Sequence, residues 1–240
     1  PPPPPPPPPP PRPTPMLNRR QRQMCIRDRQ RLGGIAALIE AALYVTGFAM
    51  FLTVLDPAGY VGHAQKDAFL ADNQVALFIA NLLISVVFGV VLVVLVLALH
   101  ARLKNEAPAI MRTATAFGLI WAGLVIASGM IANIGNSTVV ALFSENQDQA
   151  VSLWLAMSTL QEALGGGNEI LGGLWVLLLS WAALRTAELP KVLNYIGVLV
   201  GVAGILTVVP TFDVLMDVFG LGQIVWFVWL GIVMLRDAPS

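Results

Sequence analysis

The chain has 240 residues, of which 56% are hydrophobic and 12% are charged, with a net charge of zero and a mean hydropathy of +0.73. Soluble domains carry about 25% charged residues, so this composition leaves too little polar surface for a water-soluble globule. The zero net charge provides no bulk attraction to nucleic acid, and the single cysteine, Cys25, excludes a disulfide within these residues. The apolar residues come in long blocks, which is typical of a polytopic, all-α membrane helix bundle in a lipid bilayer.

The first 30 residues differ in character from the rest of the chain. Residues 1–11 are an uninterrupted proline run, which favours polyproline II and cannot form a core. The stretch 19–30 reads RRQRQMCIRDRQ and resembles translated adapter read-through at the end of an assembled sequence. We therefore interpret residues 1–30 as a disordered, non-native tail and residues 31–240 as a single six-span membrane domain. A native basic tail is the alternative.

Three apolar blocks of spanning length follow the tail. About 20 residues at a rise of 1.5 Å cross a hydrocarbon core of about 30 Å. The first block is 33–55, and Asp56-Pro57 ends it because proline lacks a backbone donor. The second block is 75–99 and the third is 113–135.

Residues 149–164 have helical periodicity and allow two interpretations. They can form an amphipathic helix in the membrane surface, or they can be the outer end of the fourth span. The glycines at 165–167 favour a break after them. The fourth span is then 168–184, which is short, and the fifth and sixth spans follow at 192–209 and 221–235.

Lysine and arginine in the short loops predict the orientation of such a bundle. If the domain begins inside, Lys66 is the one basic residue of residues 31–240 that falls outside. The basic residues that fall inside are Arg31, Arg102, Lys104, Arg112, Arg185, Lys191 and Arg236. This asymmetry predicts six spans in the inner membrane with both termini cytoplasmic.

The last three spans carry the most distinctive sequence. They read GGGNEILGGLWVLLLSWAALR, LPKVLNYIGVLVGVAGILTVVP and FGLGQIVWFVWLGIVML. Over residues 165–235 they resemble the domain of unknown function 4386 family of bacterial integral membrane proteins. The resemblance implies a multi-pass inner-membrane protein, and it implies neither an activity nor a functional residue.

Glu40 is the sharpest candidate for a functional side chain, because it lies inside the first span. A carboxylate at the bilayer centre costs at least about 2.5 kcal/mol. The helical face of Glu40 also carries Gly33, Ala36, Ala37, Tyr44 and Gly47. Small residues mark a helix-packing face, so we expect Glu40 to point into the bundle. There it is either a proton or cation site, or a protonated packing residue bonded to a neighbour.

Glu169 has a simpler interpretation. Asn168 is expected to cap the fourth span, and a carboxylate in the first helical turn complements the helix dipole. In the six-span topology Glu169 lies near the outer surface, whereas Glu40 lies in the inner half of the bilayer. We therefore do not expect the two carboxyl groups to form a paired catalytic site.

Polar and small residues form stripes on the other spans. Asn81 and Ser85 share a face with Gly89, Asn133 and Asn136 share one with Gly129, and Gln223 shares one with Gly231. Interhelical hydrogen bonds, at about 1 kcal/mol or less each, explain these stripes, and a shared polar cavity is the alternative.

Glycines and tryptophans give two further expectations. Gly197, Gly201 and Gly204 predict a close helix approach on the fifth span, within the bundle or in a homo-oligomer. An aromatic belt at the membrane interface is the default interpretation of Trp154, Trp175, Trp181, Trp226 and Trp229.

The sequence has no HExxH, no P-loop and no paired CxxC, and we predict neither a metal nor a cofactor. A non-enzymatic structural or regulatory bundle is the favoured function. The alternative is a small-solute or ion transporter, or a ligand-binding bundle, that uses the intramembrane Glu40. An intramembrane enzyme on a lipid substrate is the third hypothesis. Transport predicts that Glu40, Asn81 and Asn133 line one hydrated cavity, whereas a scaffold predicts that they are buried, bonded and dry.

Overall fold

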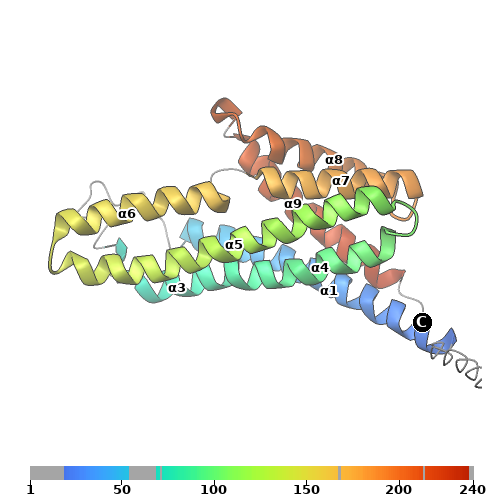
Figure 1. The fold of residues 1–240 in the computed structure, drawn as a ribbon, viewed down its shortest axis with the longest axis horizontal. Coiled ribbons are helices and arrows are strands. Elements are labelled where there is room, and N and C mark those ends of the chain that lie inside the picture. Colours follow the sequence, from blue (N-terminus) through green and yellow to red (C-terminus); the bar gives the residue numbers. More distant parts are fainter. Residues whose placement is uncertain (1–18, 54–68, 71, 167–168, 213, 238–240) are drawn as a thin grey trace, which may run out of the picture.

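The computed structural model of the chain describes residues 19–53, 69–70, 72–166, 169–212 and 214–237. Within these ranges the regular secondary structure is helical, and the helices form an elongated bundle (Figure 1). The elements are α1 (Arg19–Thr53), α3 (Gln74–Asn81), the π-helical η2 (Leu82–Val87), α4 (Phe88–Leu103), α5 (Pro108–Phe143), α6 (Gln147–Gln161), the π-helical η3 (Glu162–Gly166), α7 (Ile170–Thr186), α8 (Lys191–Leu206), the 3-10 turn η4 (Pro210–Phe212) and α9 (Val214–Arg236).

Four helical stretches are long and apolar enough to cross a membrane, namely Arg27–Met50, Gln74–Leu103, Pro108–Phe143 and Val214–Arg236. The helices α7 and α8 are apolar but shorter. Large apolar side chains are exposed along the bundle, as expected for a surface that contacts lipid. The all-α class and the presence of several candidate membrane spans are therefore confirmed.

The first helix begins earlier than the first apolar block. α1 starts at Arg19, so residues 19–30, which we expected to be disordered, continue the first span as a helix. Residues 1–18, which contain the proline run, lie outside the described part of the chain. That residues 1–30 are non-native stays a prediction.

The helix α5 is longer than the predicted third span, 113–135. It continues through the polar residues that follow, where Ser137 and Thr138 donate their hydroxyls to the carbonyl of Ile134. With 36 residues, α5 is about 54 Å long, which exceeds a hydrocarbon core of about 30 Å.

The segment 149–164 lies along the bundle. α6 begins at Gln147, where the side chain of Asn146 accepts a hydrogen bond from the backbone N–H of Gln149 at 3.2 Å. α6 then packs beside the second half of α5, and α7 packs beside the first half of α5 (Figure 1). The helix α6 is therefore aligned with α5, and η3 connects it towards α7.

An aromatic cluster fills the middle of the bundle. The ring centroids of Trp121 and Trp175 are 5.9 Å apart, and those of Trp175 and Trp226 are 5.8 Å apart. Trp175 and Trp226 are fully buried, so the aromatic-belt interpretation is wrong for both. It fits Trp181, which is half exposed and has the Arg185 guanidinium 5.6 Å from its ring.

The glycines of α8 allow close contacts with neighbouring helices of the same chain. A Cβ on Gly201 would lie 2.8 Å from the carbonyl oxygen of Gly173 on α7, and a Cβ on Gly173 would lie 2.7 Å from that of Gly201. Gly197 and Gly204 are also buried, against Ser180 of α7 and Phe219 of α9. The predicted close approach is confirmed within the bundle, so this face is not available to a second copy of the chain.

One end of the bundle is closed by Arg102, whose side chain is 7% exposed. Its Nη2 donates to the backbone oxygen of Glu188 and to Oδ2 of Asp237, both at 2.8 Å. At the same end, His100 Nδ1 lies 2.7 Å from Thr115 Oγ1 on α5. These contacts tie the end of α4 to α5, to the α7–α8 turn and to the end of α9.

Candidate functional site

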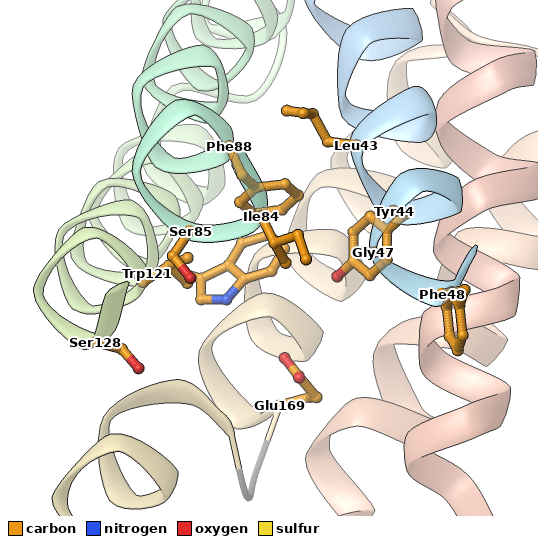
Figure 2. A pocket seen from close by; sticks show the side chains of 11 residues that line it. Leu43, Tyr44, Gly47, Phe48, Ile84, Ser85, Phe88, Trp121, Ser128 and Glu169 are labelled. Atoms are coloured by element: carbon orange, nitrogen blue, oxygen red, sulfur yellow. The ribbon is translucent and has the colours of Figure 1, made fainter. Parts of the chain in front are cut away.

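A cavity of about 320 Å³ lies between α1, η2, α5 and the start of α7 (Figure 2). Its wall is mostly apolar and aromatic, and its polar side chains are Tyr44, Ser85, Ser128 and Glu169. Ligand pockets in proteins begin at about 300 Å³ and combine apolar walls with a few convergent polar groups. The volume and the lining of this cavity both meet that description.

Two hydrogen bonds fix the backbone of Glu169, and its side chain points into the cavity. It occupies the N-cap position of α7 without a side-chain capping bond. Its backbone N–H donates to Thr207 Oγ1 at 2.9 Å, and its carbonyl accepts from the N–H of Gly173 at 2.8 Å. Figure 2 shows the Glu169 carboxyl pointing into the cavity. The expected cap, Asn168, lies outside the described residues.

Tyr44 supplies the second polar group from the opposite wall. It extends from α1, and its ring packs edge-on against Phe88, with centroids 5.3 Å apart at 81°. The Tyr44 hydroxyl turns into the cavity, towards the side on which Glu169 lies (Figure 2). Tyr44 also interacts electrostatically with the carboxyl groups of both Glu169 and Glu40. A phenol and a carboxyl group from helices distant in sequence therefore face the same space.

Irregular helix surrounds the cavity. Ser85 belongs to the π-helical η2, and the π-helical η3 lies before Glu169 in the chain. At the end of α6, the hydroxyl of Ser128 donates to the backbone oxygen of Gln161 at 3.3 Å. π-Helical turns widen a helix locally and occur frequently at functional sites. Here they lie where the helices separate enough to leave a cavity.

A protein-family model described as a domain of unknown function (DUF4386) matches residues 32–233. The chain belongs to this family. The match begins just after the segment that we interpret as non-native and contains every residue of the cavity wall. No curated protein and no solved structure matches the chain. The DUF4386 family indicates no activity, so the function is argued from the site.

Glu40 points into the DUF4386 bundle and is fully buried. It lies one helical turn from Tyr44 on α1, but it is not on the cavity wall. Neither of its carboxyl oxygens has a hydrogen-bond partner among the described residues. Glu40 therefore matches neither the bonded carboxyl that a scaffold predicts nor the cavity-lining carboxyl that transport predicts.

The other predicted site residues are divided among several places. Ser85 shares the cavity with Glu169. Asn133 lines a separate hollow of about 220 Å³ beside α3. Gln223 is fully buried on α9, and its side-chain amide has no partner within the described chain. Asn81 is half buried where α3 meets η2. The structure thus joins Ser85 to Glu169 and separates the remaining four candidates.

Two of the predicted stripes meet each other. A Cβ on Gly129 of α5 would clash with Ser85 and would lie 3.1 Å from the backbone oxygen of Asn81. A Cβ on Gly89 of α4 would lie 2.8 Å from the backbone oxygen of Ala122. These small residues let the second and third spans approach closely, which is the packing role expected of such stripes.

Tyr44, Trp121 and Ser128 are among the wall residues that were not identified as site residues from the sequence. Tyr44 had a detectable signal, because it lies on the same predicted packing face as Glu40. Trp121 and Ser128 had none, because their position depends on how α5 is rotated against η2 and α7.

The cavity has the chemistry of a binding site. It combines one carboxyl group, one phenol and two aliphatic hydroxyls with apolar and aromatic walls. A serine nucleophile requires a neighbouring base, and no histidine is among the wall residues. Among the described residues, no group of three His, Cys, Asp or Glu side chains can hold a metal ion. The arrangement can hold a ligand by one polar end and by an apolar body.

Proposed function

We propose that this DUF4386 protein is a six-span inner-membrane protein that binds a small amphipathic solute in the outer half of its bundle. The observation that carries the proposal is the cavity, in which the Glu169 carboxyl and the Tyr44 hydroxyl face each other within aromatic walls. Protein interiors contain few voids larger than a water molecule. A cavity of about 320 Å³ beside an acidic side chain offers space and a polar group for a bound solute.

The helix lengths support six spans. α7 and α8 have 17 and 16 residues, so they are about 26 and 24 Å long, slightly short of a core of about 30 Å. α7 pairs closely with α8, and α8 pairs closely with α9, inside the bundle. Because α6 and η3 run along α5 before α7 begins, they extend the fourth span outwards and do not form a surface helix.

The charge distribution supports cytoplasmic termini. The end closed by Arg102 also carries Lys104, Arg112, Arg185 and Lys191, which come from the ends of α4, α5, α7 and α8. Basic residues gather on the cytoplasmic side of membrane proteins. This end is therefore the inner end, and the α5–α6 turn with the acidic Glu145 and Asp148 lies outside.

The same assignment gives the depth of the cavity. About 20 helical residues span the hydrocarbon core, so the outer boundary falls near Leu83 when counted from Leu103, and near Ala132 when counted from Arg112. Ser85 and Ser128 lie just inside that boundary. The cavity is therefore in the outer leaflet, close to the outer surface, where a solute can reach it without crossing the membrane.

A cavity-filling variant tests the proposal. We would measure thermal stability and tryptophan fluorescence of the full chain in detergent against a panel of small amphipathic solutes. Val125→Phe places a larger side chain on the cavity wall. The matched control is Gly123→Leu on the same helix, because a Cβ at Gly123 meets nothing within 4 Å.

We expect at least one solute to stabilise the wild type and the control, and Val125→Phe to abolish that stabilisation. If no solute binds, or if Val125→Phe binds as well as the wild type, the binding proposal fails and a structural or regulatory role replaces it.

A further inference from the structure

We infer that the cavity selects an organic cation: a primary ammonium group on a compact apolar or aromatic body, with the charge held at Glu169. The inference rests on the proposed function, because it names the ligand class of the same cavity. Four features of the cavity support it, namely its charge, its hydrogen-bond acceptors, its aromatic wall and its size.

The side chains that line the cavity can carry negative charge but no positive charge. Glu169 is the one acidic residue among the wall residues, and they include no lysine, arginine or histidine. Within the described chain, the Glu169 carboxyl makes no ion pair and no side-chain capping bond. An unpaired carboxylate in apolar surroundings is costly. A ligand that brings a positive charge offsets that cost, whereas an anionic ligand adds repulsion.

The acceptors suit an ammonium group. A primary ammonium has three N–H donors and no acceptor. The Glu169 carboxyl can accept one in a charge-assisted hydrogen bond, and the hydroxyl oxygens of Tyr44 and Ser85 also face the cavity (Figure 2). These three groups come from α7, α1 and η2, so they surround the space from different sides.

An aromatic wall faces the same space. Phe88 contacts Tyr44 at 5.3 Å and Trp121 at 5.6 Å between ring centroids, so the three rings form a continuous surface. Aromatic faces attract cations within about 6 Å of the ring centroid. The same rings provide an apolar surface for the body of the ligand. This wall therefore favours a cation over a neutral solute of the same shape.

The volume of the cavity limits the size of the ligand. At about 320 Å³ the cavity is at the lower end of the range for ligand pockets, which is about 300–1,000 Å³. A cavity of about 150 Å³ already holds benzene, so a ligand with one ring and a short amine arm fits this volume. 2-Phenylethylamine is therefore a suitable probe, with 2-phenylethanol and 3-phenylpropionate as its neutral and anionic analogues.

The test is a calorimetric titration of these three probes into the full chain in detergent. We expect the amine to bind at least about tenfold more tightly than the alcohol, and the acid to bind most weakly. Glu169→Gln keeps the size of the side chain and removes its charge. We expect it to lower the affinity for the amine about tenfold and to leave the affinity for the alcohol unchanged.

Control variants separate the effect of the lost charge on binding from an effect on folding. Glu162→Gln removes an exposed carboxyl from the neighbouring η3 and should bind all three probes as the wild type does. Tyr44→Phe keeps the aromatic ring and removes one acceptor, so it should weaken amine binding by a smaller factor than Glu169→Gln does. The thermal stability of each variant shows that it is folded.

The outcomes distinguish this inference from the proposed function. If the amine and the alcohol bind equally well, or if Glu169→Gln leaves amine binding unchanged, the cation inference fails while solute binding in the cavity stands. If none of the three probes and no other small solute binds, both fail.

Discussion

Two carboxyl groups of the described part of the chain, the buried Glu40 and the partly buried Glu169, lie in different surroundings. Glu40 is fully buried where α1 packs against α4 and α9, and it is not among the residues that line the cavity. Glu169 faces a cavity, and its backbone is fixed by Thr207. An acidic residue inside a membrane bundle is by default a functional candidate. The comparison shows that space next to the carboxyl group, and not burial alone, distinguishes a binding group from a packing residue.

The helix geometry explains the difference. Around Glu40, small residues bring regular α-helices together: a Cβ on Gly34 would lie 3.1 Å from the backbone oxygen of Gly231, and a Cβ on Gly231 would lie 2.9 Å from that of Gly34. Near Glu169, two elements are π-helical, namely η2 and η3. The part of the bundle around Glu40 is therefore closely packed, and the part around Glu169 contains the cavity.

The largest expected effect concerns the closely packed part around Glu40. Gly34→Val places side-chain atoms where Leu235 and the Gly231 backbone already lie, and we expect it to destabilise the fold by about 3 kcal/mol or more. Gly123→Val on the open face of α5 should change stability by about 0.5 kcal/mol or less. Denaturant unfolding in detergent measures both. Equal stability of the two variants would contradict the tight packing of α1 against α9.

The second prediction concerns the cavity beside Glu169 and pH. Protonation of the Glu169 carboxyl removes the charge that binds an ammonium ligand, so amine affinity should fall on acidification, by up to about tenfold per pH unit. The groups that face Glu169 are the Tyr44 phenol and the hydroxyls of Ser85, Ser128 and Thr207, and none of these side chains is basic. Calorimetric titration of 2-phenylethylamine across pH 5–8 measures the effect.

The control for this prediction is the neutral analogue. The affinity for 2-phenylethanol should not change over the same pH range, and Glu169→Gln should bind the amine with the same weak affinity throughout. An amine affinity of the wild type that is independent of pH would contradict the role of Glu169.

The third prediction concerns Glu40. Neither of its oxygens has a hydrogen-bond partner among the described residues, so Glu40→Leu removes a buried polar group without breaking a bond. We expect the variant to be more stable than the wild type by about 1 kcal/mol, and solute binding to be unchanged. Thermal unfolding in detergent and the solute panel measure these two quantities. Loss of solute binding in a folded Glu40→Leu variant would show that Glu40 belongs to the site.

The smallest expected effect is at the inner end. Asp237 accepts from Arg102 at 2.8 Å, but its side chain is 48% exposed. Exposed ion pairs contribute about 0.2–1 kcal/mol, so Asp237→Asn should cost about 0.5 kcal/mol. Arg102→Ala should cost more, because the side chain of Arg102 is buried and also bonds to the backbone of Glu188. Thermal unfolding in detergent ranks the two variants, and the reverse order would contradict this account of the inner end.

Sequence patterns predicted the parts of this structure that depend on local composition. The apolar blocks gave the membrane class, the small residues around Glu40 gave its inward direction, and the glycines of α8 gave a close helix contact. Each of these predictions uses the sequence pattern of a single helix. The full length of α5 was not predicted, because the third span was limited to the apolar block 113–135, whereas the helix continues through the polar residues that follow.

The cavity could not be predicted in the same way. Its wall combines Tyr44, Ser85, Trp121 and Glu169 from four separate elements, and their meeting depends on helix rotation and tilt. The π-helical turns near the cavity have no periodicity of their own in the sequence. Glu169 was expected to complement the helix dipole, and the sequence held no sign that α1 would bring a phenol opposite to it.

The most direct test of the central claim is the reactivity of a cysteine placed in the cavity. Ser85→Cys in a Cys25→Ser background would be exposed, in membranes, to small methanethiosulfonate reagents that carry either an ammonium or a sulfonate group. We expect reaction from the outer side, with a ratio of cationic to anionic rates that is about tenfold higher than the ratio for a small free thiol. Glu169→Gln should abolish that difference, and 2-phenylethylamine should slow the reaction. A ratio equal to that of the free thiol, or reaction from the cytoplasmic side alone, would contradict an outward-facing cavity that selects cations.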